Sequence, residues 1–552
     1  MAVPTYNEPN VNPYWEMGTL NDQLNTVYSY HDATKHHYRR YARSLGFMDW
    51  STQPDPFRRY EGAENVQLER PDDEASPTWD SLFRGEKKPA AVTPGSLSRF
   101  FFLSLALSAW KQVVSPGGEV ASRWALRVNP SSGNLHPTEG YLINADGVFH
   151  YAPKEHVLEK RAGFEADEWA PFAEQLPKGA FLAGLTSIHW REAWKYGERA
   201  FRYCQHDVGH ALGALGVAAA RLNWRIRLLD GPETHVIDRL LGVEGQQGPE
   251  KEHGDCLVVV WPGQEPENVA IPPLPTPSGW AGVPNRLSLK HQDWPIIPEV
   301  AGAAVWPGGA EGTSNIVYGD PPTPDRNLAA DRLIRGRRSA VAMDKKTALP
   351  AEAFFRLLGR LMPGHGHPVF GAAPGLDHVS LAIFVHRVDG LEPGMYALVR
   401  HPDHEASLRA SLRHDFSWVP PPGRPADLPL FVLGHGDLRD PARQLSCGQD
   451  IAADGAFSLG MLARFDQALN AQGPGMYPRL FWETGMIGQM LYLEAEAAGA
   501  RGTGIGCFFD DEVHRALGIE DHAWQSLYHF TVGGAVEDDR LQTASAYPDQ
   551  SK

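Results

Sequence analysis

The sequence has few cysteines and an excess of acidic over basic residues. Only four of its 552 residues are cysteines, Cys204, Cys256, Cys447 and Cys507, and none are paired at CxxC spacing. This pattern argues against a disulfide framework and a structural zinc site, and fits a reducing cytoplasm. With 51 basic and 67 acidic residues, the formal net charge is -16. Such a balance argues against nucleic-acid binding and against a polybasic membrane anchor.

Long hydrophobic runs are also missing. The most apolar stretch, around Phe100 to Trp110, is too short to cross a bilayer. The N-terminal MAVPTYNEPN lacks the basic and apolar segments of a signal peptide. We therefore expect a soluble, cytoplasmic protein. Its length exceeds what a single hydrophobic core supports, which predicts two domains.

Proline and glycine are concentrated in the middle of the chain, between Pro262 and Pro324, in runs such as PPLPTPSG and GDPPTPD. Proline lacks a backbone donor and fixes φ, so such a region resists regular structure. The pattern predicts a first domain at 20–265, a linker at 266–325 and a second domain at 326–545. The polar ends of the chain, about 1–20 and beyond Arg540, are expected to be extended or poorly ordered.

The two halves contain similar segments. Residues 209–223 (GHALGALGVAAARLN) and 485–499 (GMIGQMLYLEAEAAG) predict helices of the same length and pattern. The same register aligns 239–243 with 515–519, and both halves continue into an apolar strand. A third pair of similar segments, each predicted as a strand followed by a turn, starts at Gly147 in the first half and at Gly394 in the second. Three matched elements in one order indicate a duplication. Strands and helices alternate without a regular βαβ order, which favours an α+β fold.

Two motifs contain candidate binding residues. Arg335, Arg337, Arg338 and Ser339 place forked cations beside a hydroxyl, which suits a phosphate monoester, although a solvated basic helix end fits this motif equally well. The second motif, RVNPSSGNLHPTE at 127–139, is a proline-bracketed loop whose Ser, Gly and Asn residues can turn backbone amides toward a ligand. The following YLINADGVFHY predicts a strand pair.

Together with WKYGERAFRY at 194–203, these motifs resemble the nitroreductase superfamily, and PSSGNLHPTE resembles its azoline-dehydrogenase branch (the SagB/ThcOx type). The resemblance implies α+β sandwich domains and FMN at the interface of a dimer. In this chain two tandem domains would form an intramolecular pseudo-dimer. The expected assembly is a monomer or a homodimer of such chains.

The resemblance also implies roles for individual residues. It places the FMN phosphate and ring against Arg335, Arg337, Arg338, Ser339, Gly504, Ile505, Gly506 and Arg540 of the second domain, and against Arg127, Pro130, Ser131, Ser132 and Asn134 of the first. Lys195 and Tyr196 match the catalytic base pair of the azoline branch, with Arg199 and Arg202 near enough in sequence to favour a neutral lysine. The alternative is that this pair only packs the start of the following helix.

The positions that would build a second flavin site are different. We expect them at 364–368 (GHGHP) and 30–35 (YHDATK), which lack the serine pair and the arginines. One FMN per chain is therefore predicted. The spacing of His206 and His210 resembles a metal-binding pair, but no third ligand is evident, and no metal is expected.

The predicted function is FMN-dependent oxidation of an azoline-type peptide or small heterocyclic substrate, by hydride transfer to flavin. Two alternatives remain open at this point. One is an NAD(P)H-dependent nitro or quinone reductase, with NAD(P)H or O2 as electron partner. The other is a degenerate protein that binds flavin or another ligand without catalysis.

Overall fold

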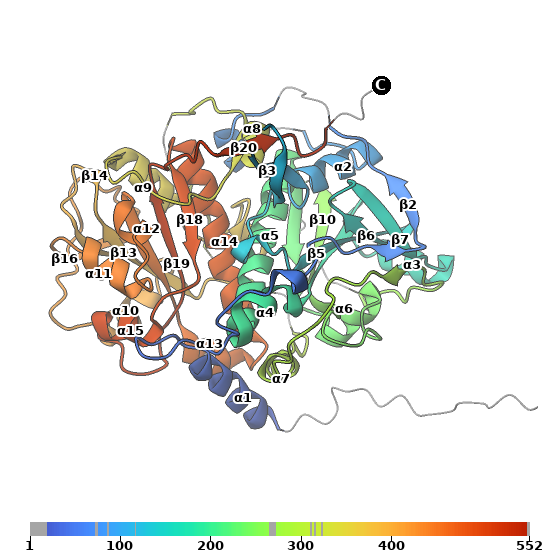
Figure 1. Cartoon of the computed structure of the whole chain (residues 1–552), viewed down its shortest axis with the longest axis horizontal. Coiled ribbons are helices and arrows are strands. Elements are labelled where there is room, and N and C mark those ends of the chain that lie inside the picture. The colour runs from blue at the N-terminus through green and yellow to red at the C-terminus, as the bar shows by residue number, and fades with distance from the viewer. Residues whose placement is uncertain are drawn as a thin grey trace, which may run out of the picture.

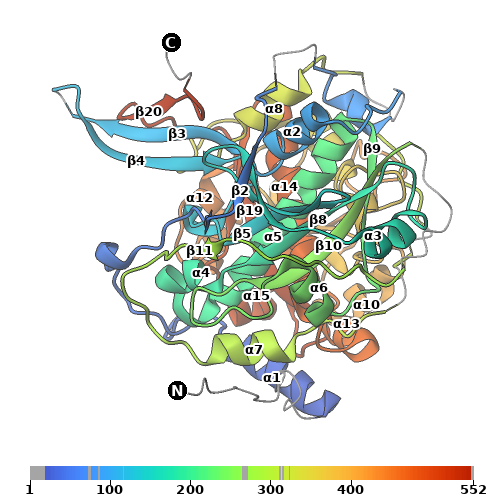
Figure 2. The same ribbon diagram turned by 90° about the vertical axis from the view of Figure 1, so that its right-hand side faces the viewer.

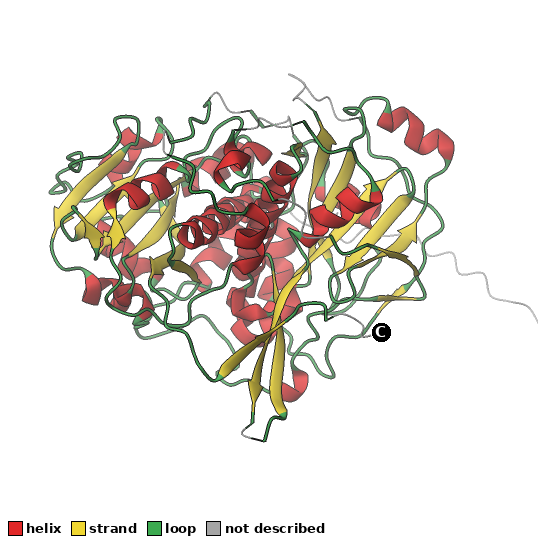
Figure 3. Cartoon of the chain, turned by 90° about the horizontal axis from the view of Figure 1, so that it is seen from above, coloured by secondary structure: helices red, strands yellow, loops and turns green. Residues whose placement is uncertain are grey.

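The computed structural model of the protein describes residues 19–71, 76–84, 88–115, 117–263, 272–309, 312–313, 316–321 and 324–548. Two sheets lie on opposite sides of the molecule, and long helices fill the space between them (Figures 1 and 3). This arrangement confirms the expected mixed architecture of helices and sheets.

The first-half sheet has seven antiparallel strands. Every residue of its strand β8 is buried, as expected where both faces of a sheet are covered. The hairpin predicted by YLINADGVFHY is present, with Asn144 paired to Gly147. The strand order is β2 (Glu64–Gln67), β7 (Val157–Ala162), β6 (Gly147–Ala152), β5 (Thr138–Asn144), β8 (Phe181–Ser187), β10 (His253–Pro262) and β9 (Trp224–Leu228).

The second-half sheet has six antiparallel strands, and its central strand β17 is likewise buried throughout. Small and aliphatic side chains dominate that strand, so helices can pack on both of its faces. The strand order is β16 (Leu430–His435), β15 (Gly394–Leu398), β13 (Val379–Val385), β17 (Phe457–Ala463), β19 (Gln525–Gly533) and β18 (Arg501–Ile505).

The helices of the two halves also correspond. Helices α6 and α15 end at Gly242 and Gly518, whose positive φ values of 68° and 87° close each helix in the left-handed conformation that glycine favours. None of the helices in the described residues is long and apolar enough to cross a membrane. The first-half helices are α2 (Pro94–Phe102), α3 (Ala166–Ala173), α4 (His189–Tyr196), α5 (Ala200–Arg221) and α6 (Thr234–Leu241). Those of the second half are α8 (Ala330–Gly336), α9 (Ala351–Gly359), α10 (His404–Ser411), α11 (Arg439–Leu445), α12 (Ile451–Asp454), α13 (Phe465–Gln472), α14 (Met476–Ala497) and α15 (Asp510–Leu517).

Helices α5 and α14 contain the two predicted helical segments and cross at the centre of the molecule. Their backbones touch at a pair of glycines. A Cβ at Gly209 would lie 2.2 Å from the carbonyl oxygen of Trp482, and a Cβ at Gly485 would lie 2.2 Å from that of His206. The two contacts are reciprocal, as in a two-fold symmetric interface. The crossing therefore requires glycine on both helices.

We expect Gly209→Ala to lower the free energy of unfolding by about 1–3 kcal/mol, because the added methyl group overpacks a helix crossing that has no space for it. Urea denaturation measures this change. Gly245→Ala is the matched control, since a Cβ there has no neighbour within 4 Å. Equal midpoints for both variants would contradict the proposed tight crossing.

A second reciprocal contact relates residues of the two halves. Thr78 and Ala329 form an antiparallel bridge, flanked by backbone hydrogen bonds of 2.7 and 2.9 Å in opposite directions. Around it, residues 79–85 (WDSLFRG) match 330–336 (ADRLIRG) in sequence. The bridge therefore lies on a local two-fold axis that relates these two segments.

This axis corrects one prediction. The first-half counterpart of the arginine motif at 335–339 is 84–88 (RGEKK), and the assignment to 30–35 is wrong. Residues 85–87 of that counterpart lie outside the described residues. Residues 30–35 instead end helix α1 (Leu20–Ala33) and continue beyond it, and α1 packs on the second half, where His31 hydrogen-bonds Gln525 at 3.1 Å.

The predicted linker contains regular structure. Helix α7 (Ile296–Ala303) packs against α1, and strand β11 (Val283–Pro284) pairs with β1 (Tyr60–Glu61). The linker therefore contributes packed elements rather than only an extended connection. Residues 264–271 of this region lie outside the described part of the chain.

The C-terminal tail is also structured. Strand β20 (Leu541–Ala544) pairs with β3 (Leu107–Val114), which forms a hairpin with β4 (Val120–Arg127). Figure 2 shows this hairpin reaching away from the body of the molecule. Residues 541–544 are therefore extended, one of the two expected outcomes for the tail after Arg540, and form part of a sheet. A further short pair is β12 (Leu349–Pro350) with β14 (Val388–Asp389).

Candidate functional site

The predicted ligand loop at 129–136 has an unusual backbone. Gly133, Asn134 and His136 have φ values of 57°, 60° and 52°, which non-glycine residues rarely adopt. Two hydrogen bonds hold the loop, from Asn134 Nδ2 to Ala125 O at 2.9 Å and from His136 N to Ser131 Oγ at 2.8 Å. The loop is thus held in a conformation of the kind found at functional sites.

Asp207, on helix α5, anchors the serine pair. Its Oδ1 accepts hydrogen bonds from Ser132 N and Ser132 Oγ, both at 3.0 Å. Burial raises the pKa of Asp207 to about 7, although hydrogen bonds from Ser131 and Ser132 act in the opposite direction. Pro130 is buried in the same loop. The serine side chains predicted to contact a ligand are therefore held by the protein itself, and sequence reasoning missed the aspartate that holds them.

We expect Asp207→Asn to flatten the pH dependence of stability between about pH 4, where an aspartate in the unfolded chain titrates, and pH 7. In that range the unfolded chain releases a proton that folded Asp207 keeps. Stability from this group is therefore complete below pH 4 and falls by up to about 1.4 kcal/mol per pH unit until pH 7. Unfolding at several pH values measures the slope.

Asp255→Asn is the matched control for this variant. Asp255 is also buried, with a pKa raised to about 7 by burial, but it binds Ser187 and Gln205 instead of the loop. It should reduce the pH slope equally while leaving the loop intact. Identical slopes in the parent protein and in Asp207→Asn would refute the assignment.

The predicted catalytic pair lies directly under the loop. Lys195 and Tyr196 end helix α4, and a Cβ at Gly133 would lie 3.1 Å from Lys195 Nζ and 2.7 Å from Tyr196 Oη. The Tyr196 ring packs on that of Tyr203 with centroids 4.3 Å apart. Tyr203 in turn fills the space beside Gly506, where a Cβ would lie 2.0 Å from its ring. Tyr203 therefore connects the first-half loop to the glycine segment of the second half.

Arg199 and Arg202, the arginines predicted to lie near Lys195, both pair with one carboxylate. Arg199 Nη1 lies 3.0 Å from one oxygen of Asp510, and Arg202 Nη1 lies 2.9 Å from the other. One carboxylate balances only one of the two positive charges, so one positive charge remains. The two ion pairs hold the start of α5 against the start of α15.

Glu192 is the acidic group next to the pair, and sequence reasoning missed it. It precedes Lys195 by one helical turn, is fully buried, and both of its carboxyl oxygens are without a hydrogen-bond partner among the described residues. Burial, followed by the charge of Asp207, raises the pKa of Glu192 well above its usual value. Burial therefore favours the protonated form of this carboxyl group, which can donate a proton. Its (i, i+3) spacing to Lys195 was the available sequence signal.

Arg337 contacts the first half directly. Its Nε donates to Val128 O at 3.1 Å and its Nη2 to Arg127 O at 3.2 Å. Its Nη1 is buried and has no hydrogen-bond partner in the part of the chain that the structure describes. The side chain of Arg127 bonds the carbonyl groups of Thr138 and Pro56, so only its backbone contributes here.

Positive charge is concentrated around Arg337. Burial, followed by the charges of Arg337 and Arg501, lowers the pKa of Arg338 to about 10. Glu496 accepts a hydrogen bond from Arg338 N at 3.0 Å, but its carboxylate also pairs with Arg501 at 3.4 Å. The described residues offer the guanidinium groups of Arg337 and Arg338 no carboxylate within ion-pair distance. A desolvated pair of cations of this kind favours an anion.

Ser339 and the glycine strand meet at a tyrosine that the sequence did not predict. Tyr492 Oη accepts hydrogen bonds from Ser339 Oγ and from Gly504 N, both at 3.0 Å. Ser339 also forms a parallel bridge with Gly502, while Ile505 is buried at the end of the strand. Strand β18 and the arginine motif are therefore parts of one cluster, built on α14.

Two of the predicted residues do not join this cluster. The Arg540 side chain is 85% exposed and pairs with Asp538 at 2.7 Å. Arg335 turns to the first half, where it donates to Phe102 O at 3.0 Å and Leu107 O at 3.1 Å. Neither position supports the phosphate contact that the sequence predicts.

His206 and His210 contact the second-half sheet. His206 Nε2 lies 3.1 Å from Leu527 O, and its ring stacks on Tyr528 at 4.1 Å. His210 Nε2 lies 3.1 Å from Tyr528 Oη. The described residues contain no group of three or more metal-ligating side chains. The spacing of the two histidines thus serves packing between α5 and β19.

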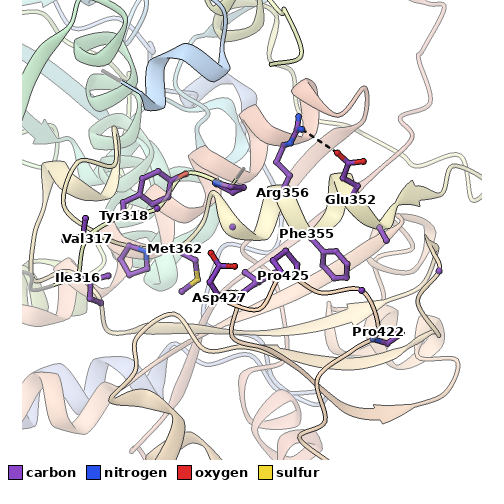
Figure 4. A pocket seen from close by; sticks show the side chains of 18 residues that line it. Ile316, Val317, Tyr318, Glu352, Phe355, Arg356, Met362, Pro422, Pro425 and Asp427 are labelled. Atoms are coloured by element: carbon purple, nitrogen blue, oxygen red, sulfur yellow. Dashed lines mark ion pairs between the residues drawn. The ribbon is translucent and has the colours of Figure 1, made fainter. Parts of the chain in front are cut away.

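A cavity of about 770 Å³ lies away from these residues, between α9 and the end of the linker (Figure 4). Its lining includes Tyr318, Met362 and the ion pair of Arg356 with Glu352, whose atoms are 3.8 Å apart. It contains none of the predicted site residues. Its size therefore does not identify it as the predicted site.

A second cavity of about 560 Å³ lies at the counterpart positions. It is lined by Arg84 of the counterpart motif, Arg225 of β9 and His365 of the 364–368 loop. Asp320 also lines it and pairs with Arg360 at 2.7 Å. The two-fold arrangement thus leaves a second cavity at the counterpart positions. Among the described residues, its lining includes Asp320 and has no counterpart of the Ser131–Ser132 pair.

Comparison with known proteins identifies the fold. Residues 415–534 match the Nitroreductase family model, described as "Nitroreductase family". A nitroreductase candidate from Anabaena variabilis is 22% identical, with a TM-score of 0.65, and the match covers 93% of this chain and 99% of that one.

Two further solved structures match less extensively. A nitroreductase candidate from Ralstonia eutropha covers 38% of this chain and 99% of its own, at 13% identity and a TM-score of 0.27. A chain of the E. coli microcin synthetase McbBCD complex covers 47% and 99%, at 14% identity and a TM-score of 0.24. No curated protein matches significantly. The chain therefore has a nitroreductase-like fold over most of its length.

Proposed function

We propose that the chain is an FMN-dependent oxidoreductase whose two halves, 20–265 and 326–545, form an intramolecular pseudo-dimer. The observation that carries this proposal is the buried Arg337 at the contact between the halves, with an unpaired Nη1 and no carboxylate partner in the described residues. A buried, unpaired cationic donor is unfavourable unless an anion completes it. The phosphate of FMN has the required charge and acceptor oxygens.

The residues present fit this cofactor. Arg337, Arg338 and Ser339 would hold its phosphate, and the loop around Gly133 would lie beside its ring. When bound, FMN supplies two-electron hydride chemistry. Lys195 and Tyr196, whose polar ends reach Gly133, would hold or move a proton at Nζ and Oη.

We propose one FMN per chain. The cavity at the counterpart positions supports this asymmetry, because no serine of the described residues lines it. In the counterpart motif, Glu86 occupies the position of Arg337, which reverses the charge. The serine pair is replaced by the histidine-containing loop at 364–368.

For the reaction, we propose oxidation of an azoline-type ring in a peptide or small heterocycle, on the basis of the Lys195–Tyr196 pair beneath the ligand loop. The test begins with the visible spectrum and flavin content of the purified protein after reconstitution with FMN. We expect one equivalent. Two equivalents would overturn the asymmetry, and a protein that cannot be reconstituted would overturn the flavin site.

Anaerobic mixing then distinguishes the substrates. Bleaching of the flavin by an azoline-containing peptide supports the proposed oxidation. Rapid bleaching by NADH, with no response to the azoline, would instead indicate a nitro or quinone reductase.

A further inference from the structure

Two cysteines lie together at the second-half end of the candidate site. Cys447 follows α11, and Cys507 lies between β18 and α15. Their loops are joined by hydrogen bonds from Phe509 N to Leu445 O at 2.8 Å and from Gln449 Nε2 to Cys507 O at 2.9 Å. The two thiol groups lie close enough that each shifts the pKa of the other.

The backbone at Cys447 is strained. Its φ is 55°, in the left-handed region that a cysteine rarely adopts, and Gly448 follows with a φ of 74°. Strain of this kind is retained where the surrounding structure needs it, and it clusters at functional sites. Cys447 and Cys507 are also partly exposed residues, whereas Cys204 and Cys256 are buried. The paired cysteines are therefore the accessible ones.

The surroundings of the two thiols shift their pKa values in opposite directions. The hydrogen bond from Cys447, with those of His36 and the charge of Arg199, lowers the pKa of Cys507, although burial opposes this. The same hydrogen bond, with burial, raises the pKa of Cys447. His36 is oriented for this contact, since its Nδ1 accepts a hydrogen bond from Ala42 N at 2.9 Å. Cys507 is thus the thiol that more readily forms the thiolate, which is the nucleophilic form.

We propose that Cys447 and Cys507 are a redox-active dithiol that closes to a disulfide by exchange with a low-molecular-weight disulfide. The Cys507 thiolate attacks one sulfur of that compound, forms a mixed disulfide and releases the first thiolate. Cys447 then loses its proton and attacks Cys507 Sγ, which releases the second thiolate. The protein loses two electrons and two protons, and the small disulfide becomes two thiols.

The pair adjoins the candidate flavin strand. Cys507 directly follows Gly506, which packs on Tyr203 and through it on Tyr196. A disulfide would tie the Cys447 loop to the segment that leaves this strand. The dithiol itself does not depend on bound flavin, so its test is independent of the proposed function.

The test uses the full chain, reduced, desalted and incubated with oxidised glutathione. We expect the mass to fall by two hydrogen atoms and a digest to yield one disulfide-linked peptide pair containing Cys447 and Cys507. The reduced protein should react with iodoacetamide at Cys507 before Cys447. A stable glutathione adduct in the parent protein, or no reaction at either thiol, would overturn the proposal.

Single variants separate the two roles. Cys447→Ser should accumulate the glutathione adduct on Cys507, because the resolving thiol is missing. Cys507→Ser should remain unmodified. Cys204→Ser is the matched control and should close the disulfide like the parent protein. If Cys447→Ser instead shows no adduct while it remains folded by circular dichroism, Cys507 is not the attacking thiol and the mechanism is wrong.

Discussion

Arg337→Ala is expected to weaken FMN binding by about 10- to 100-fold. A hydrogen bond to a charged group contributes about 1.5–3 kcal/mol, and each 1.4 kcal/mol is a factor of ten in affinity. Arg337 is only 4% exposed, and its unpaired Nη1 is the donor that a phosphate would complete. Fluorescence titration of the apoprotein with FMN measures the dissociation constant.

Two further variants make this test specific. Arg337→Lys keeps the charge but loses the forked donor, so its affinity should lie between those of the parent and Arg337→Ala. Arg540→Ala should bind FMN normally, since the structure places that side chain at an exposed ion pair with Asp538. A thermal melt of each apoprotein shows whether loss of binding merely reflects unfolding. If Arg540→Ala and Arg337→Ala lose the same affinity, the predicted phosphate site is misplaced.

Lys195→Ala is expected to lower kcat by about 10²- to 10⁴-fold while the protein stays yellow, because general acid–base catalysis contributes a factor of this size. Its Nζ reaches the loop at Gly133, where the flavin ring is proposed to lie, and is not needed to hold a phosphate. Single-turnover reduction of the bound flavin by substrate, followed by absorbance, measures the effect.

The surface variant Lys178→Ala serves as the control for this loss of charge, since that residue is exposed. Tyr196→Phe removes only the hydroxyl group and should also lower kcat if the pair shares a proton. If Lys195→Ala loses flavin along with turnover, the pair has the structural role that the sequence left open. If it turns over normally, the proposed proton relay is wrong.

Much of the fold could be predicted from local patterns. The signals that predict these elements are the periodicity of helices, the β-branched residues of strands and the glycines that end α6 and α15. Each depends on residues close together in the sequence, so it can be read without the structure. The correspondence of α5 with α14 was visible for the same reason. The sequence did not show that Gly209 and Gly485 lie opposite each other. That depends on the contact between the two helix backbones.

The candidate site was predictable only in part. The loop at 129–136 and the arginine motif at 335–339 stand out because their residue types are unusual. Asp207 and Tyr492 lie on buried helices, where one more polar residue carries no distinctive spacing. Their importance comes from long-range contacts within each half: Asp207 holds the serine loop, and Tyr492 joins Ser339 to Gly504.

By itself, the sequence determined the mixed helix-and-sheet composition, the similar helical segments of the two halves and the two unusual motifs, because these depend on residue type and short-range spacing. Only the tertiary structure decided which charges meet. It paired Arg199 and Arg202 with Asp510, left Arg540 at the surface, and identified 84–88 as the counterpart of the arginine motif. Coulomb energy falls with distance in space and not along the chain, so these partners are fixed by folding alone.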